Sequence, residues 1–259
     1  MTAKSVGFIG GGRVARILLG GWKLGQSVPQ VVRVSDTGAD SLEKLRRLHP
    51  GIEPSSGDNA PPASCDIVFL ALHPPAIQGV LDGIRDHLRP GATLVSLAPK
   101  VPLARLSDLA GGIRNVARVI PNAPSIVGDG YNPIAFSGNI APEAKKDLVA
   151  LLRVLGKCPE VPEDSLEAYA ILAAMGPTYL WFQLAELLRL AESFGLNPED
   201  AMEATCRMAA GAAKTLRESG LSPEDVIDLV PVKPLADDEG TIREIYRAKL
   251  SALYRKLKA

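Results

Sequence analysis

The 259-residue sequence has little cysteine, few aromatic residues and no net charge. Its three cysteines, Cys65, Cys158 and Cys206, lie far apart and form no disulfide or metal-binding pattern, which favours a reducing cytoplasm. Lys+Arg and Asp+Glu are both 29, so no excess positive charge attracts nucleic acid or an anionic membrane. We find no apolar run that would span a bilayer and no signal-peptide pattern. We therefore expect a cytoplasmic protein without a metal site that binds neither nucleic acid nor membrane.

Short apolar runs alternate with helical patterns through the first 160 residues. Most of the runs are continuous, which is typical of strands buried on both faces of a parallel sheet. The predicted strands are Ser5–Gly10, Val31–Ser35, Ile67–Leu72, Thr93–Ala98 and Val116–Ile120, with weaker ones at Pro133–Phe136 and Cys158–Val161. The predicted helices between them are Arg13–Leu24, Ser41–Leu48, Pro75–Leu88 and Leu103–Leu109. This alternation predicts an α/β domain of the Rossmann type, with a doubly wound parallel sheet.

The strand signals end near Pro162, and long helices follow. We predict helices at Asp164–Met175, Thr178–Phe194, Pro198–Ser219 and about Thr241–Leu257. Asn197 and Ser222, each followed by proline and glutamate, are predicted N-caps. The chain is therefore predicted to consist of a dinucleotide-binding domain, residues 1–161, and an all-helical dimerisation and substrate domain, residues 162–259.

The predicted helix Thr178–Phe194 is apolar nearly all round, since its only charged residues are Glu186, Arg189 and Glu192. Such a helix should be buried on most sides. A segment of about 100 residues leaves much of its surface exposed and buries such a helix poorly. We therefore predict a homodimer formed through the C-terminal helices, the alternative being the central helix of a monomeric bundle.

The motif Gly10-Gly11-Gly12-Arg13-Val14-Ala15 follows the first strand and opens the first helix. It fits the dinucleotide fingerprint G-x-G-x-x-A in its required context. Gly10 allows the tight turn, Gly12 lets a pyrophosphate approach the backbone, and Ala15 allows close helix–strand packing. The N–H groups at the helix start then hold the phosphate charge. The alternative is a glycine turn with only a structural role.

Asp36 ends the second strand, 21 residues after Ala15, close to the spacing of the acid that binds the ribose 2′-hydroxyl. A carboxylate there would repel a 2′-phosphate, and no arginine directly follows it. The expected coenzyme is therefore NAD(P)H, with a preference for NADH. Alternatively, Asp36 only caps the Asp-Thr-Gly turn.

Several segments together resemble the pyrroline-5-carboxylate reductase family. In chain order, the resemblance lies in residues 7–15 (GFIGGGRVA), 69–75 (FLALHPP), 95–101 (VSLAPKV), 118–130 (RVIPNAPSIVGDG) and 175–179 (MGPTY). Glu186, Gly195-Leu196 and Gly211–Lys214 also match family positions. The similarity covers essentially the whole chain.

The resemblance implies a Rossmann domain followed by a helical domain that interlocks two subunits. It also implies reduction of a cyclic imine bond, C=N, by hydride from C4 of the nicotinamide of NAD(P)H. The protein's main task would be to position the coenzyme and the small-molecule substrate.

The chain departs from the family at the substrate side. The hydroxyl-rich substrate loop of the family corresponds to Val230–Ile242, of which only Gly240-Thr241-Ile242 matches. Lys100 replaces a family glycine, His73 replaces a lysine, and Ala173 and Met175 replace serines. A reductase of a different imine or keto substrate therefore stays open, as does a non-catalytic NAD(P)-binding sensor or interaction protein.

The candidate catalytic residues are Lys100, Asn122 and Thr241. Lys100 could bind a substrate anion or donate a proton, Asn122 could orient nicotinamide or substrate, and Thr241 could donate a hydroxyl. A solvated loop lysine and a turn asparagine are the alternatives for the first two. The residues predicted to bind the coenzyme are Gly10, Gly11, Gly12, Arg13, Val14, Ser35, Asp36, Leu72, His73, Pro74, Ala98 and Asn122.

Overall fold

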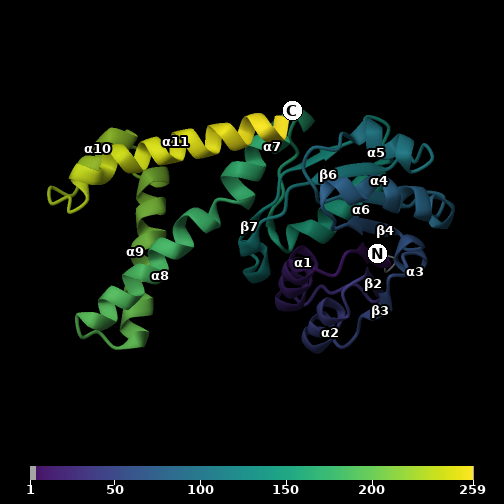
Figure 1. Cartoon of the computed structure of the whole chain (residues 1–259), viewed down its shortest axis with the longest axis horizontal. Coiled ribbons are helices and arrows are strands. Elements are labelled where there is room, and N and C mark those ends of the chain that lie inside the picture. The colour runs from purple at the N-terminus through teal and green to yellow at the C-terminus, as the bar shows by residue number, and fades with distance from the viewer. Residues whose placement is uncertain (1–3, 259) are drawn as a thin grey trace. The chain divides into compact units, whose positions relative to one another are not determined.

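A seven-stranded sheet forms the centre of the N-terminal part of the chain (Figure 1). The computed structural model describes residues 4–258. The strands lie in the order β3-β2-β1-β4-β5-β6-β8, and all pair in parallel except β8, which is antiparallel to β6. Their bounds are β1 Val6–Ile9, β2 Val32–Asp36, β3 Glu53–Ser56, β4 Ile67–Leu70, β5 Thr93–Ser96, β6 Val116–Val119 and β8 Ile134–Phe136. This is the predicted Rossmann-type sheet.

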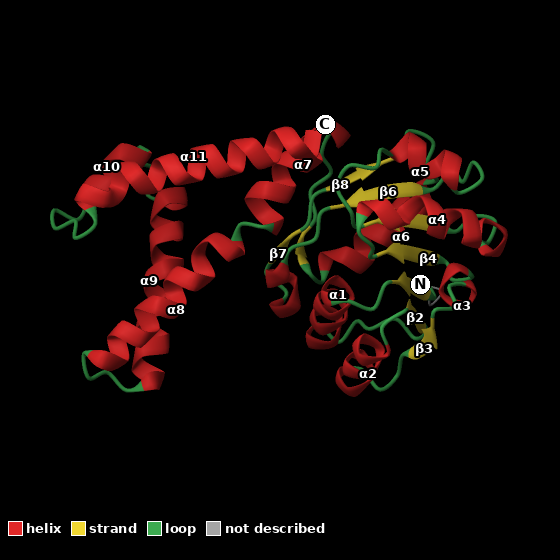
Figure 2. Cartoon of the chain, viewed as in Figure 1, coloured by secondary structure: helices red, strands yellow, loops and turns green. Residues whose placement is uncertain are grey.

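Helices cover both faces of this sheet (Figure 2). Three of them, α1 (Arg13–Leu24), α2 (Ala39–Leu48) and α6 (Pro142–Arg153), share one core cluster with β1 and β2. On the other face, α3 (Ala60–Ala63), α4 (Pro74–Ile84) and α5 (Leu103–Leu109) share a second cluster. Successive residues of β4 alternate between the clusters, because neighbouring side chains of a strand point to opposite faces. The continuous apolar runs are therefore buried on both sides, as predicted.

Several elements of this region have no counterpart among the predicted ones. Strand β3 reads Glu-Pro-Ser-Ser and lies at the edge of the sheet, where proline is tolerated and apolar residues are not required. Helices α3 and α6 were also not predicted. A small second sheet pairs β7 (Gly130–Tyr131) with β9 (Gly156–Lys157), just before the weak strand expected at Cys158–Val161.

The chain divides into two compact units, residues 1–175 with 254–259, and residues 176–253. The division falls after residue 175, which is 14 residues later than the predicted boundary after residue 161. The difference arises because α7 (Leu166–Tyr169) belongs to the sheet unit. Leu166 and Ala170 lie in the core cluster of the α4 face, so this first part of the helical region packs on the sheet.

The second unit consists of helices. They are α8 Pro177–Ser193, α9 Pro198–Glu218, α10 Pro223–Asp228 and α11 Ala236–Lys258, the last of which ends in the first unit. Both predicted N-caps are confirmed, since Asn197 accepts a hydrogen bond from the Asp200 N–H and Ser222 from the Asp225 N–H. Helix α11 begins five residues before the predicted start, with three acidic residues in its first turn, where the helix dipole favours negative charge.

Helix α8 has no buried residue in the single chain. Trp181 and Phe182 are 52% and 67% exposed. In contrast to the expectation from the sequence, the helical stretch Glu163–Ser193 is long and apolar enough to cross a membrane by length and composition. One such helix is weak evidence, because a core helix of a soluble protein passes the same test. The predicted burial of α8 is therefore not supplied by the described part of its own chain.

Candidate functional site

A cavity of about 680 Å³ opens at the carboxyl ends of the parallel strands. Its walls come from the loops after β1, β4 and β5 and from helices α1 and α2. The strand order reverses between β1 and β4, and open α/β sheets bind ligands at such a switch point. The lining residues are Gly11, Gly12, Arg13, Val14, Arg16, Ser41, Lys44, Ala71, Leu72, His73, Pro74, Leu97, Ala98 and Pro99.

The glycine turn after β1 has two positions with different constraints. Gly10 has a φ of +104°, and a Cβ there would lie 2.4 Å from the carbonyl oxygen of Ala71. This position therefore requires glycine for the fold itself. A Cβ on Gly12 would meet nothing within 4 Å. Gly12 lines the cavity, and the space next to its Cα is open. A pyrophosphate needs such a space to approach the backbone closely.

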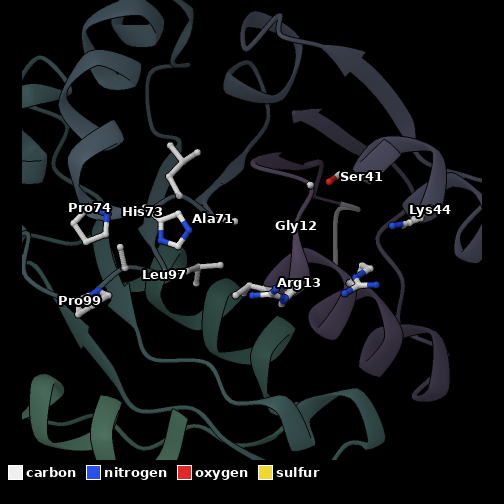
Figure 3. A pocket seen from close by; sticks show the side chains of 14 residues that line it. Gly12, Arg13, Ser41, Lys44, Ala71, His73, Pro74, Leu97 and Pro99 are labelled. Atoms are coloured by element: carbon white, nitrogen blue, oxygen red, sulfur yellow. The ribbon is translucent and has the colours of Figure 1, made fainter. Parts of the chain in front are cut away.

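The start of α1 offers donors and positive charge to this cavity. Gly12 is the N-cap of α1, no side chain caps the helix, and its first turn has no acidic residue. Arg13 and Arg16 line the cavity from α1, and Ser41 and Lys44 line it from α2. Figure 3 shows Gly12 and Arg13 between His73 on one side and Ser41 and Lys44 on the other. Three cations, one hydroxyl and a free helix start fit the phosphates of a dinucleotide.

Asp36 holds the glycine turn rather than lining the cavity. Its Oδ2 accepts a hydrogen bond from the Gly11 N–H at 2.8 Å, and its Oδ1 accepts one from the Gly38 N–H at 2.7 Å. The turn-capping alternative therefore describes what the structure contains, and the glycine contact adds a second role. A carboxylate can accept further hydrogen bonds, so a ribose hydroxyl can share these oxygens.

Ser35 is fully buried, and its hydroxyl donates to the Asn59 Oδ1 at 2.6 Å. It does not line the cavity, although it was predicted to contact the coenzyme. Because neighbouring side chains of a strand point to opposite faces, Ser35 points away from the face of β2 on which Val34 and Asp36 lie against Gly11.

The wall opposite α2 comes from the ends of β4 and β5. His73 is the N-cap of α4 and exposed, and Leu72, Pro74 and Ala98 lie beside it in the lining. In Figure 3 the imidazole of His73 lies near Ala71 and Leu97. A histidine in this wall can stack on or hydrogen-bond a bound ring.

Lys100 is exposed and follows Pro99, the last lining residue of the β5 loop. It is not itself in the lining. Its backbone has a φ of +82°, and its N–H donates to the Glu167 Oε1 at 3.1 Å. Lys100 therefore lies in the loop beyond the carboxyl end of β5, directly after the cavity lining.

Asn122 uses its amide within the protein and is 8% exposed. Its Oδ1 accepts from the Tyr131 N–H at 3.0 Å, and its Nδ2 donates to the Ala173 carbonyl at 3.5 Å. Through these two hydrogen bonds Asn122 shapes the loop before β7, and it does not line the cavity.

Burial and the neighbouring Tyr169 phenol raise the pKa of Tyr131, which keeps the Tyr131 phenol neutral.

Thr241 lies in α11 in the second unit and is exposed. Lys233, in the loop before α11, forms an ion pair with Asp228 at 3.5 Å. The structure describes this unit by itself, so the predicted role of Thr241 stays a prediction.

Eight of the residues predicted to bind the coenzyme line the cavity: Gly11, Gly12, Arg13, Val14, Leu72, His73, Pro74 and Ala98. The other lining residues were not predicted: Ala71, Leu97 and Pro99 in the strand-end loops, and the polar Arg16, Ser41 and Lys44. A signal for the three polar residues exists in the helical period, because Arg16 lies three residues after Arg13 and Lys44 three after Ser41, each on the same helix face. Within residues 4–258 no three His, Cys, Asp or Glu side chains form a metal-binding group.

Two family models match the chain. Residues 5–100 match the family described as NADP oxidoreductase coenzyme F420-dependent. Residues 163–234 match the family described as pyrroline-5-carboxylate reductase dimerisation. The first match contains all lining residues of the cavity, and the second begins one residue after the predicted domain boundary.

Whole-chain relatives agree with these matches. A pyrroline-5-carboxylate reductase of Methanosarcina acetivorans is 28% identical over 232 residues, which cover 89% of this chain and 85% of that protein. The solved structure of a pyrroline-5-carboxylate reductase from Coxiella burnetii superposes with a TM-score of 0.75 at 26% identity, covering 99% of this chain and 98% of that one. A Plasmodium falciparum pyrroline carboxylate reductase solved with NADP bound shares the fold, with a TM-score of 0.82 at 19% identity over 100% and 98% of the chains.

Proposed function

Because this chain belongs to the pyrroline-5-carboxylate reductase family, we propose that it is an NAD(P)H-dependent reductase that acts on the C=N bond of a small cyclic imine. The observation that carries the proposal is the cavity at the switch point of the sheet, with its open glycine and its three cations. The nicotinamide supplies a hydride when the coenzyme is bound.

The residues of the cavity have separate tasks in this proposal. The Gly12 backbone and the start of α1 hold the pyrophosphate, and Arg13 and Arg16 neutralise its charge. His73 and Ala98, at the ends of two strands, wall in the nicotinamide. Lys100 meets the substrate at the same edge, and Asn122 keeps the loop before β7 in place through the Ala173 carbonyl. Thr241 donates its hydroxyl to the substrate from the helical unit.

The preference for NADH rests on Asp36, which a 2′-phosphate would face at the end of β2. Lys44 and Ser41 in the cavity wall work in the other direction, since an ammonium and a hydroxyl bind phosphate. We propose that the balance between Asp36 and Lys44 sets the preference between the two coenzymes.

A reductase of a different imine or of a keto acid is the second candidate. It is favoured by the loop before α11, where Val230, Val232 and Leu235 are exposed and apolar instead of hydroxyl-bearing. A sheet of this type holds the coenzyme for either reaction, so only the substrate distinguishes them.

The assembly proposed is a homodimer through the C-terminal helices, in the cytoplasm. The match to a dimerisation family over residues 163–234 and the exposed apolar residues of α8 support it. A second subunit would cover the residues that the single chain leaves in solvent.

The function is tested with the purified full chain. NADH and NADPH oxidation is followed by absorbance with a panel of cyclic imines and keto acids, and coenzyme affinity is measured by calorimetry. Turnover with a cyclic imine supports the proposal, and turnover only with keto acids supports the second candidate. Coenzyme binding without turnover of any substrate would favour a non-catalytic NAD(P)-binding protein, and absence of binding at millimolar coenzyme would refute all three.

A further inference from the structure

Two residues other than glycine have a positive φ in the described part of the chain, Gln26 at +50° and Lys100 at +82°. This region is unfavourable for a residue with a Cβ. Gln26 follows Gly25, the C-cap of α1, where a left-handed residue commonly ends a helix. Lys100 follows a strand and precedes the N-cap of α5 by two residues, so no helix end explains its conformation.

A buried ion pair holds the backbone of Lys100 in place. The Oε1 of Glu167 accepts from the Lys100 N–H at 3.1 Å and from Nη2 of Arg118 at 2.6 Å. Arg118 and Glu167 are 2% and 6% exposed. Burial would raise the pKa of the Glu167 carboxyl, but hydrogen bonds from Arg118 and from the Lys100 N–H lower it overall, so this acceptor is ionised.

The other end of the same loop is held in the same way. The Oε1 of Glu163 accepts from the Leu103 N–H at 2.7 Å and from Nη1 of Arg118 at 3.0 Å. One arginine of β6 therefore aligns two carboxylates, and these bind the first and last N–H groups of the segment Lys100–Leu103. Backbone strain persists only where the surroundings enforce it, and it gathers at functional sites.

The strained residue, Lys100, directly follows the lining of the coenzyme cavity. Leu97, Ala98 and Pro99 line the coenzyme cavity, and Lys100 comes next, with its side chain exposed. The ammonium of an exposed lysine that directly follows the cavity lining can pair with an anionic group on the molecule to be reduced.

We propose that Glu167 and Arg118 are positioning residues that fix the left-handed Lys100, and that Lys100 binds the anionic substituent of the substrate. The inference rests on the proposed function and deepens it, since it names the residue of this chain that meets the anionic group of the substrate. Glu167 acts through the backbone of Lys100 and does not touch the substrate.

The experiment compares two imines of the same ring, 1-pyrroline-5-carboxylate and 1-pyrroline, which lacks the carboxylate. Lys100→Gly removes the ammonium and suits the backbone. We expect kcat/KM for the carboxylated imine to fall about tenfold, mainly through KM, because one hydrogen bond to a charged group is lost. The value for 1-pyrroline should stay within about twofold, and Lys100→Arg should retain most of the activity.

Glu167→Gln tests the positioning role. It should lower kcat/KM for the carboxylated imine several-fold and increase amide exchange in peptides that cover Lys100–Leu103. In the double variant with Lys100→Gly it should cause no further loss, because the lysine it positions is gone. Gln26→Gly is the matched control: it relieves the other positive φ and should leave kcat/KM unchanged.

Each contrary result has its own meaning. Equal kcat/KM of the unmodified protein and Lys100→Gly on the carboxylated imine would overturn the assignment of Lys100. Additive losses in the double variant, or unchanged amide exchange in Glu167→Gln, would overturn the positioning role. If the unmodified protein reduces neither these imines nor any other, the proposed function fails and the inference fails with it.

Discussion

The two units of this chain bury their apolar residues to different extents. In the sheet unit, both faces of the strands are covered by helices of the same chain, and residues such as Phe8, Trp22 and Phe69 are fully buried. In the helical unit, α8, α10 and α11 have no buried residue. The apolar residues of the sheet unit thus form a core within the chain, whereas those of α8 stay exposed in the single chain, as on a surface that another molecule covers.

The largest effect is expected from Phe182→Asp in α8. If the homodimer proposed above uses this face, a charge at a buried aromatic position should weaken association by about 1,000-fold, equivalent to ~4 kcal/mol. Size-exclusion chromatography with light scattering should then report a monomer. Arg189→Ala on the same helix, which removes an exposed ion pair with Glu186, should leave the dimer intact. A dimeric Phe182→Asp protein with unchanged affinity would show that the two units do not differ in this way.

Gly10→Ala should have the next largest effect and should act on the sheet unit alone. The added Cβ would lie 2.4 Å from the Ala71 carbonyl oxygen at a φ of +104°, so the free energy of unfolding should fall by more than about 2 kcal/mol. Urea unfolding followed by tryptophan fluorescence measures it, since Trp22 lies in this core.

Gly12→Ala is the matched variant two residues later. Its Cβ meets nothing within 4 Å, so unfolding should be almost unchanged while coenzyme affinity falls about tenfold. Calorimetric titration with NADH and NADPH tests this. Equal stability of the two variants, or unchanged coenzyme affinity of Gly12→Ala, would contradict the assigned roles.

The coenzyme preference should shift with two single changes in the sheet unit. Lys44→Ala should lower the affinity for NADPH about fivefold and leave the affinity for NADH almost unchanged. Only NADPH carries the 2′-phosphate with which an ammonium can pair. Asp36→Ser should raise the affinity for NADPH relative to that for NADH. Ratios of Kd for the two coenzymes report both effects, and a Lys44→Ala variant that loses both equally would place Lys44 at the pyrophosphate instead.

The smallest effect should come from pH acting on His49. This residue is 8% exposed at the C-cap of α2. Burial, with a smaller contribution from the charge of Lys23, lowers the pKa of His49 in the folded protein. The unfolded chain then binds more protons, so the sheet unit should lose stability as the pH falls below about 6.5, the ordinary histidine value.

His49→Gln should reduce this loss, and His87→Gln, at an exposed position, should not. Urea unfolding at several pH values measures both. A pH dependence that is the same in the His49→Gln and unmodified proteins would show that other groups cause it.

The coenzyme motif was predictable because its chemistry is local. Gly10, Gly12 and Ala15 act within one turn and one strand–helix junction, so their spacing alone indicates their roles. Helix α6 was not predicted, although the sequence contains a signal for it. Pro142 stands at its first position, and the buried Leu148 and Leu152 have helical spacing. Strand β3 was not, because its four residues carry no apolar signal and its pairing depends on β2.

The sequence by itself determined the alternation of strands and helices, the glycine turn and the change to long helices, because these depend on neighbours within a few residues. The tertiary structure decided that Lys44 and Ser41 join Arg13 around one cavity, that Asp36 holds the glycine turn, and that Glu167 and Arg118 hold Lys100. Asp36 and Gly11 lie 25 positions apart along the chain, and Lys100 and Glu167 lie 67 positions apart. Such distances along the chain close only when strands pair and helices pack, and no local pattern encodes which partners meet.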